Sequence, residues 1–313
     1  MSVRLPARRW PRSRLSWLSS DRGRDSLFGL ALFTPALVVF LVFAARPVAE
    51  TIVTSFSRKD LTQPELGTPF VGLGNYAQLL SLSTFWPTVI NSVVLAASSA
   101  VAQIVLGFGV ALLLNQAFRF RMLVRASVLL PWAMPTVVAA FVFRWLFDAS
   151  FGPINAILEG LGLVSQPIAW LGSPSTALLT VITVHIWKGI PFVILVFLAA
   201  LQTLSKELHD AAQVDGAGYW QELRHVTLPQ LRYIIAIALI LRFIWTFNWF
   251  DLTYLLTGGG PGDSTMTLPI QVYITAFRTF QLGLSSAYAT MIALVLMTMT
   301  VTFLWLVTRE KYQ

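Results

Sequence analysis

Five aromatic and polar residues lie within ten positions of one another, near the end of an apolar stretch. They are Trp245, Asn248, Trp249, Asp251 and Tyr254. An Asn amide both donates and accepts hydrogen bonds, and an aromatic ring can stack on the apolar face of a sugar ring. On a helix, Trp245, Asn248 and Trp249 would share one face with Leu252. The segment is therefore a candidate sugar path, although Trp and Tyr near the ends of membrane helices often serve only as interfacial anchors.

Ionisable residues in other apolar stretches leave two interpretations open. Polar groups inside a membrane span are costly and usually face a protein interior or a cavity. Asp251 could contact a ligand, but pairing with a cation or ordering the following glycine-rich loop is the simpler expectation. Four basic residues could line a path for an anion, or could pair with neighbouring groups. They are Arg144, His185, Lys188 and Arg242.

The apolar stretches that carry these residues dominate the 313-residue chain. Hydrophobic residues make up 56% of the sequence and charged residues 12%, and the mean hydropathy is +0.70. A helix needs about 20 apolar residues to cross a bilayer, and continuous apolar runs favour helices over the alternating strands of a membrane barrel. The sequence therefore predicts an all-α polytopic membrane protein with six transmembrane helices. The six windows cover residues 27–45, 88–114, 126–147, 175–201, 233–256 and 285–307.

The positions of the 22 Lys and Arg predict the orientation of these helices. Cationic residues in short loops stay on the cytoplasmic side, and most of them fall there if both termini are cytoplasmic. The outer side then holds only Arg58, Lys59 and Arg278. The net charge of +8 fits anionic inner-leaflet lipid and gives no support to nucleic-acid binding. We expect a basic cytoplasmic segment (residues 1–26), a membrane domain (27–308) and a cytoplasmic tail (309–313).

A charged, glycine-containing insert at about residues 204–230 interrupts the apolar pattern on the cytoplasmic side. Apolar side chains at helical spacing begin just after Ser205, which stands at a helix N-cap position. Gly216 can adopt the positive φ that ends a helix, and Pro229 suits the first turn of the next span. The pattern predicts two short helices joined at an angle. Without further information they could equally be an amphipathic connector lying on lipid headgroups.

The insert resembles the EAA loop of ABC importer permeases, which has Glu-Ala-Ala, three residues, Gly, nine residues and Ile-x-Leu-Pro. Here the motif reads Asp210-Ala211-Ala212, Gly216, Val226 and Leu228-Pro229, with every spacing kept. Asp replaces the usual Glu and Val the usual Ile, and these replacements preserve the charge and the apolar character of the two positions. The resemblance implies a coupling helix that docks on a cytoplasmic ATPase subunit. The implied docking residues are Asp210, Ala211, Ala212, Asp215, Gly216 and Ala217.

Further stretches, among them "FVGLGNYAQLL" and "FNWFDLTYLLTGGGPGDSTMTLPIQVYITAF", are similar to the sugar-type branch of these permeases. The resemblance implies the type I importer permease fold in the bacterial inner membrane and half of a path for a di- or oligosaccharide. It also implies a second, different permease, two ATPase subunits and an extracytoplasmic solute-binding protein. Glycerol-3-phosphate, a related glycerophosphodiester or a polyol is the alternative substrate.

The sequence disfavours other classes of function. A G-x-x-x-x-G-K-[ST] phosphate loop is absent, so ATP and magnesium are expected in the partner ATPase and no cofactor in this chain. With no Cys, no H-E-x-x-H and no G-x-S-x-G, we expect neither a metal site nor catalytic residues. A secondary transporter or channel is the alternative from another class, but it leaves the EAA-like loop unexplained.

Overall fold

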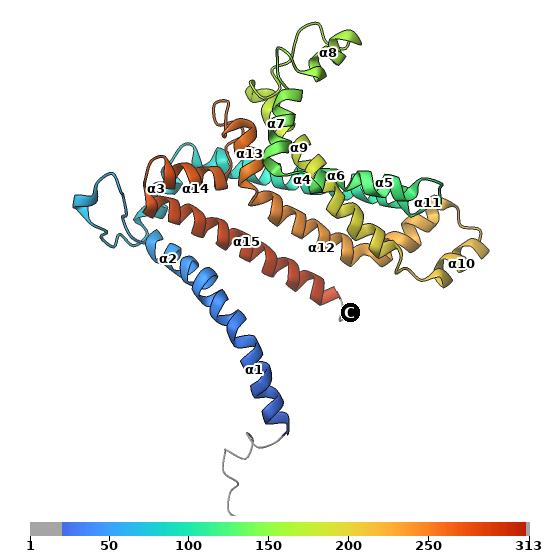
Figure 1. Cartoon of the computed structure of the whole chain (residues 1–313), viewed down its shortest axis with the longest axis horizontal. Coiled ribbons are helices and arrows are strands. Elements are labelled where there is room, and N and C mark those ends of the chain that lie inside the picture. Colours follow the sequence, from blue (N-terminus) through green and yellow to red (C-terminus); the bar gives the residue numbers. More distant parts are fainter. Residues whose placement is uncertain (1–20, 311–313) are drawn as a thin grey trace, which may run out of the picture. The chain divides into compact units, whose positions relative to one another are not determined.

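The computed structural model describes residues 21–310, and nearly all of its regular structure is helical (Figure 1). Within these residues, extended pairing is limited to two isolated bridges, Ser57 with Phe70 and Asp60 with Gln281. Most of the expected basic segment 1–26 and part of the tail 309–313 lie outside the described residues. The chain divides into two units, Met1–Val53 and Thr54–Gln313, which are described separately.

The helix of the first unit is longer than the sequence predicts. It comprises α1 (Asp21–Phe40), the π-helical segment η2 (Leu41–Ala45) and α2 (Arg46–Ser55), whose last residues belong to the second unit. The apolar span expected at 27–45 runs from Phe28 to Ser55. The Arg46 guanidinium contacts the Glu50 carboxylate at 2.8 Å one turn later. Arg46 and Glu50 are charged residues inside the apolar helix, and their i,i+4 pairing lets the helix continue past them.

The second unit contains the remaining helices. They are η3 (Pro64–Leu66), α3 (Gly74–Ser81), α4 (Phe85–Asn115), α5 (Arg121–Val128), α6 (Leu130–Ala133), α7 (Thr136–Leu146), α8 (Pro153–Gly160), α9 (Pro174–Leu201), α10 (Lys206–Val214), α11 (Tyr219–Glu222), η4 (Leu223–Thr227), α12 (Leu228–Phe247), α13 (Phe250–Thr257), α14 (Leu268–Phe277) and α15 (Leu282–Glu310). Over the described residues, five helices are long and apolar enough to cross a membrane, or six if one bent pair counts as a span.

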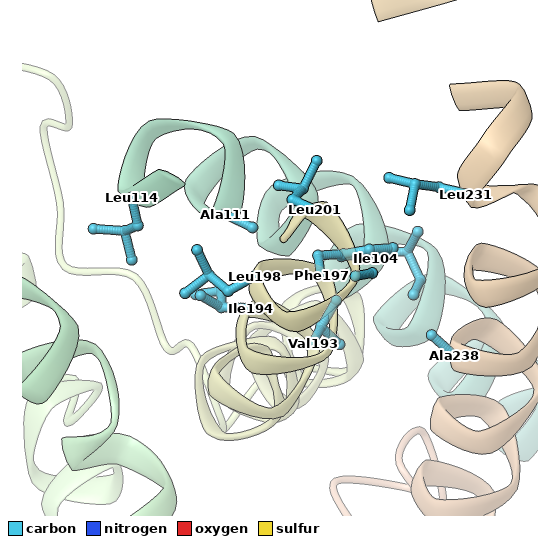
Figure 2. Packing of buried hydrophobic residues seen from close by; sticks show 11 residues of the cluster. Ile104, Ala111, Leu114, Val193, Ile194, Phe197, Leu198, Leu201, Leu231 and Ala238 are labelled. Carbon is cyan, nitrogen blue, oxygen red and sulfur yellow. The ribbon is translucent and has the colours of Figure 1, made fainter. Parts of the chain in front are cut away.

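The core of the second unit is the packing of α4, α9 and α12 (Figure 2). Phe197 and Val193 of α9 are fully buried against α4, and Leu231 of α12 is buried in the same cluster. A Cβ on Gly107 would lie 2.7 Å from Val193 Cγ1, so only a glycine allows this approach of α4 to α9. Small residues at helix contacts allow the close backbone approach on which membrane helices depend.

The third predicted span, 126–147, is not a single straight helix. Arg121–Ala133 and Thr136–Leu146 meet at 95°. Pro135 cannot donate a backbone hydrogen bond and disfavours helical geometry in Met134, whose ψ is 130°. The Lys188 ammonium on α9 donates to the carbonyl of Pro131 at 2.8 Å and also to the carbonyl of Met134. Pro135 therefore accounts for the kink, and Lys188 of α9 contacts the chain on the N-terminal side of it.

The fifth span predicted at 233–256 was wrong at both ends. The helix runs continuously from Tyr219 to Phe247 through α11, η4 and α12, so the second short helix of the insert is the beginning of this span. It ends at Asn248, and Trp249 has an extended ψ of 91° before α13 begins. Leu252 and Leu256 of α13 are buried in a cluster with α7 and α9. This packing favours a separate helix α13 over a continuation of α12.

Candidate functional site

The cytoplasmic insert folds around a glycine that ends a helix. Just after the end of α10, the Gly216 amide donates to the Gln213 carbonyl at 3.1 Å and the Ala217 amide donates to the Ala212 carbonyl at 2.9 Å. Gly216 has φ +77°, which completes the Schellman arrangement of a helix C-terminus. Ser205 occupies the N-cap position, but its side chain makes no capping hydrogen bond. The expected helix end at Gly216 is thus confirmed.

The six candidate docking residues surround this glycine on the surface of the insert. Asp210, Ala211, Asp215 and Gly216 are exposed, and Ala212 and Ala217 are half-buried. Large apolar side chains beside them also face outward: Val214 is 87% exposed and Trp220 is 75% exposed. Exposed apolar side chains gathered next to small residues are typical of a surface that another protein covers. Docking itself remains a prediction.

A histidine–carboxylate contact joins the two arms of the insert. His209 Nδ1 of α10 lies 2.5 Å from Glu222 Oε1 of α11, and the two side chains are 24% and 23% exposed. Both residues line a cavity of about 160 Å³ whose other walls include Leu112 of α4 and Leu201 of α9. The two arms of the insert therefore contact each other, and the insert lies against the ends of α4 and α9.

The candidate sugar-path residues are not on one helical face. Trp245 and Asn248 are exposed at the end of α12, whereas Leu252 of α13 is fully buried. The Asn248 amide donates to the Ile244 carbonyl at 3.0 Å. Trp249 is half-buried and meets the His185 ring edge-on at 5.2 Å. The expectation of a single face was wrong because the helix ends between Asn248 and Trp249.

The other two candidates lie on the short helix α13. Asp251 is exposed, and the Tyr254 hydroxyl accepts a hydrogen bond from Arg278 at 2.8 Å. Tyr254 stacks on Phe250 with ring centres 4.9 Å apart, and both rings contact Tyr273 of α14 at 5.0 Å. Phe250 and Tyr254 are spaced by one helical turn and Tyr273 follows in a separate apolar segment, so local sequence indicates only part of this aromatic group.

A buried polar network links two of the four basic residues whose roles were open, Arg242 and His185. Arg242 is 3% exposed, and its Nε donates to Gln103 Oε1 at 2.5 Å. Gln103 Nε2 donates to the His185 carbonyl at 2.8 Å, and His185 Nε2 lies 2.9 Å from the Thr253 hydroxyl. These contacts favour the pairing interpretation over an anion path. Gln103 was also missed, although a lone amide in a charge-free span is a signal of buried polar contacts.

Arg144 lies apart from this network, at the end of the unit opposite the insert. Its Nη1 is 3.4 Å from the Leu255 carbonyl, and it lines a cavity of about 640 Å³ with Asp148, Trp170 and Tyr254. Amide hydrogens of Phe151 and Ser150 bond to the Asp148 carboxylate and lower its pKa below the ordinary value. The cavity combines aromatic rings with groups that can bond hydroxyls.

Comparisons with known proteins agree with this architecture. Residues 103–309 match the family described as "Binding-protein-dependent transport system inner membrane component". The trehalose/maltose permease MalF of Thermococcus litoralis is 36% identical over 90% of this chain and 94% of its own length. The sulfoquinovosyl glycerol permease SmoG of Agrobacterium fabrum is 36% identical over 95% of this chain and 93% of its own length. The chain therefore belongs to the family of binding-protein-dependent transport system inner membrane components.

A solved structure supports the fold. The chain is similar to a subunit of a bacterial ABC transporter that imports the acidic polysaccharide alginate, with a TM-score of 0.80 and 24% identity. The match covers 93% of this chain and 98% of that one. The predicted importer permease fold is confirmed, as are multiple membrane spans in an inner-membrane protein. The orientation of the termini remains a prediction.

Proposed function

We propose that this chain is the permease subunit of an ATP-driven, binding-protein-dependent importer, and that it forms half of a path for a di- or oligosaccharide. The observation that carries the proposal is full-length similarity to permeases named for carbohydrates, at 36% identity for the trehalose/maltose permease. A diacetylchitobiose permease of Streptomyces coelicolor, 32% identical over 90% of this chain, supports the same substrate class. The exposed amide of Asn248 and indole of Trp245 suit a sugar.

The proposed energy source is a cytoplasmic ATPase that docks on the insert through the six exposed or half-buried residues around Gly216. ATP and magnesium would bind to that partner, because this chain has no phosphate loop. A second, different permease would complete the path, and a solute-binding protein would deliver the sugar from outside. The positive-inside distribution of Lys and Arg places the insert and both termini in the cytoplasm in this proposal.

A substrate that joins a polyol or sugar to an acidic group is the second candidate. The observation that favours it is the 36% identity to the sulfoquinovosyl glycerol permease, which matches slightly more of this chain than the trehalose/maltose permease does. Glycerol-3-phosphate and glycerophosphodiesters fall in the same class. Competition between neutral and acidic candidates in one uptake assay would separate the two classes.

The proposal is tested by purifying the chain with its co-expressed partner subunits and measuring uptake and ATP hydrolysis in liposomes. The key variant is Gly216→Pro, because proline cannot adopt φ +77°. Its matched control is Gly218→Ala, at an ordinary φ of −74°. We expect Gly216→Pro to lose sugar-stimulated ATP hydrolysis and the control to keep it. Uptake that continues without ATP or an ATPase would instead identify a secondary transporter or channel.

A further inference from the structure

The His209–Glu222 contact bridges two helices of the insert. It joins α10, which carries the candidate docking residues, to α11, across the bend at Gly216. Backbone hydrogen bonds from Gly216 and Ala217 fix the end of α10, but a Cβ built on Gly216 would meet no atom within 4 Å, so the bend is not packed on that side. An imidazole N–H that donates to a carboxylate makes a strong, directional hydrogen bond when solvent access is limited. Here about three quarters of each side chain is covered.

Glu222 also belongs to a much longer rigid element. The helix from Tyr219 to Phe247 has 29 residues, which corresponds to a length of about 43 Å. Glu222 lies in its first turn, and Arg242 and Trp245 lie near its other end. Arg242 is anchored to Gln103 of α4, and its guanidinium lies over the Trp245 ring at 5.6 Å. The long helix therefore connects the turn that holds Glu222 with the candidate sugar path.

We infer that His209 and Glu222 are a positioning pair that makes α10 and the long helix Tyr219–Phe247 move as one body. Without the pair, α10 can follow the ATPase while the long helix stays behind. The inference rests on the proposed function, since it concerns how ATP-driven motion reaches the path. It predicts that loss of the pair lowers the number of sugar molecules imported per ATP hydrolysed while the ATPase still docks.

The first test measures sugar uptake per ATP in the reconstituted complex. We expect His209→Ala to retain the ATPase in purification and to lower this ratio roughly fivefold, the lower end of typical coupling between sites. The reversed pair, His209→Glu with Glu222→His, should restore the ratio. The matched control is His225→Ala, because His225 is exposed and its ring contacts only the local Gln221 carbonyl among the hydrogen bonds described. If His209→Ala fails to assemble, Glu222→Met keeps nearly the same side-chain length, removes the hydrogen-bond acceptor and carries the test.

The second test measures rigidity directly and does not depend on transport. The chain has no cysteine, so cysteines introduced at the exposed positions Gln213 and Arg224 can carry spin labels in the full chain in nanodiscs. We expect the distance distribution between the labels to broaden in His209→Ala and to stay narrow in His225→Ala. An unchanged distribution and an unchanged uptake ratio in His209→Ala would overturn the inference. A wild-type complex without ATP-driven uptake would instead overturn the proposed function.

Discussion

Gly189 shows how one residue can fix a buried polar network. A Cβ at this position of α9 would overlap the Arg242 guanidinium and lie 2.8 Å from Gln103 Cδ. Both side chains are almost completely buried, so neither can swing into open space. The absence of a side chain at Gly189 thus allows Arg242 and Gln103 to meet between α4, α9 and α12.

We therefore expect Gly189→Ala to break the Arg242–Gln103 hydrogen bond and to destabilise the protein by about 2 kcal/mol, as for a buried bond to a charged group. Thermal unfolding in detergent measures the change. Gly109→Ala is the matched control, since Gly109 lies in α4 and a Cβ there meets nothing within 4 Å. Equal stability of the two variants would contradict the assigned role of Gly189.

Asp148 gives a prediction about pH. Hydrogen bonds from the Phe151 and Ser150 amides favour the charged carboxylate, so its folded-state pKa lies below the ordinary 3.8. Because this pKa is depressed, the contribution of the turn to stability is complete above pH 3.8 and is lost as pH falls through the lowered value. Carbon-13 NMR of labelled aspartate carboxyl groups, with the signal assigned by its loss in Asp148→Asn, should show a titration midpoint below 3.8. A midpoint at or above that value would exclude these bonds.

At the scale of elements, apolar run length predicted the existence of the long helices but not where they bend or end. The Tyr219–Phe247 helix ends inside the predicted span 233–256, because α13 gains burial against α7 and α9. That gain depends on residues far away in the sequence, which no local pattern contains. Conversely, Gly216 ends α10 through its own backbone freedom, so the end of α10 was predictable from local signals. The expected second short helix is instead the start of the long helix.

The residues of the candidate site also divide into those that local sequence could place and those that it could not. The six docking candidates all lie between residues 210 and 217, so local sequence could place them together on the surface of the insert. The path candidates fall on both sides of the helix end at Asn248, and helical spacing could not place them. Arg242 and Gln103 are separated by 139 positions, so only the packing of α4 on α12 reveals that they are partners.

Lys188 provides a prediction for the bent third span. Its ammonium bonds the Pro131 and Met134 carbonyls, which the break at Pro135 leaves without helical partners. Lys188→Met keeps the length and removes the donors. We expect at least about tenfold faster amide hydrogen exchange in residues 130–140, because an unsatisfied buried carbonyl costs about 1–3 kcal/mol. Lys59→Met, in the loop after α2, is the control. Unchanged exchange in Lys188→Met would mean that the bend does not depend on the Lys188 contacts.

At the scale of the whole molecule, the exposed end of α12 indicates that another surface completes the path. Asn248 is exposed, and 46% of the Trp245 side chain is accessible. An amide that faces lipid inside a membrane is costly, whereas one that faces a water-filled cavity or a second subunit is not. The proposed second permease would supply such an environment.

The same whole-molecule argument yields a test of orientation. Val214 in the insert and Phe151 in the loop after α7 are 87% and 80% exposed, and the distribution of Lys and Arg assigns them to opposite sides of the membrane. Because the chain has no cysteine, a single cysteine at either position can be labelled in intact spheroplasts with a membrane-impermeant maleimide. We expect Phe151→Cys to react from outside and Val214→Cys to react only after lysis. The reverse pattern would place the insert outside, where no cytoplasmic ATPase could reach it, and would overturn both the orientation and the coupling role of the insert.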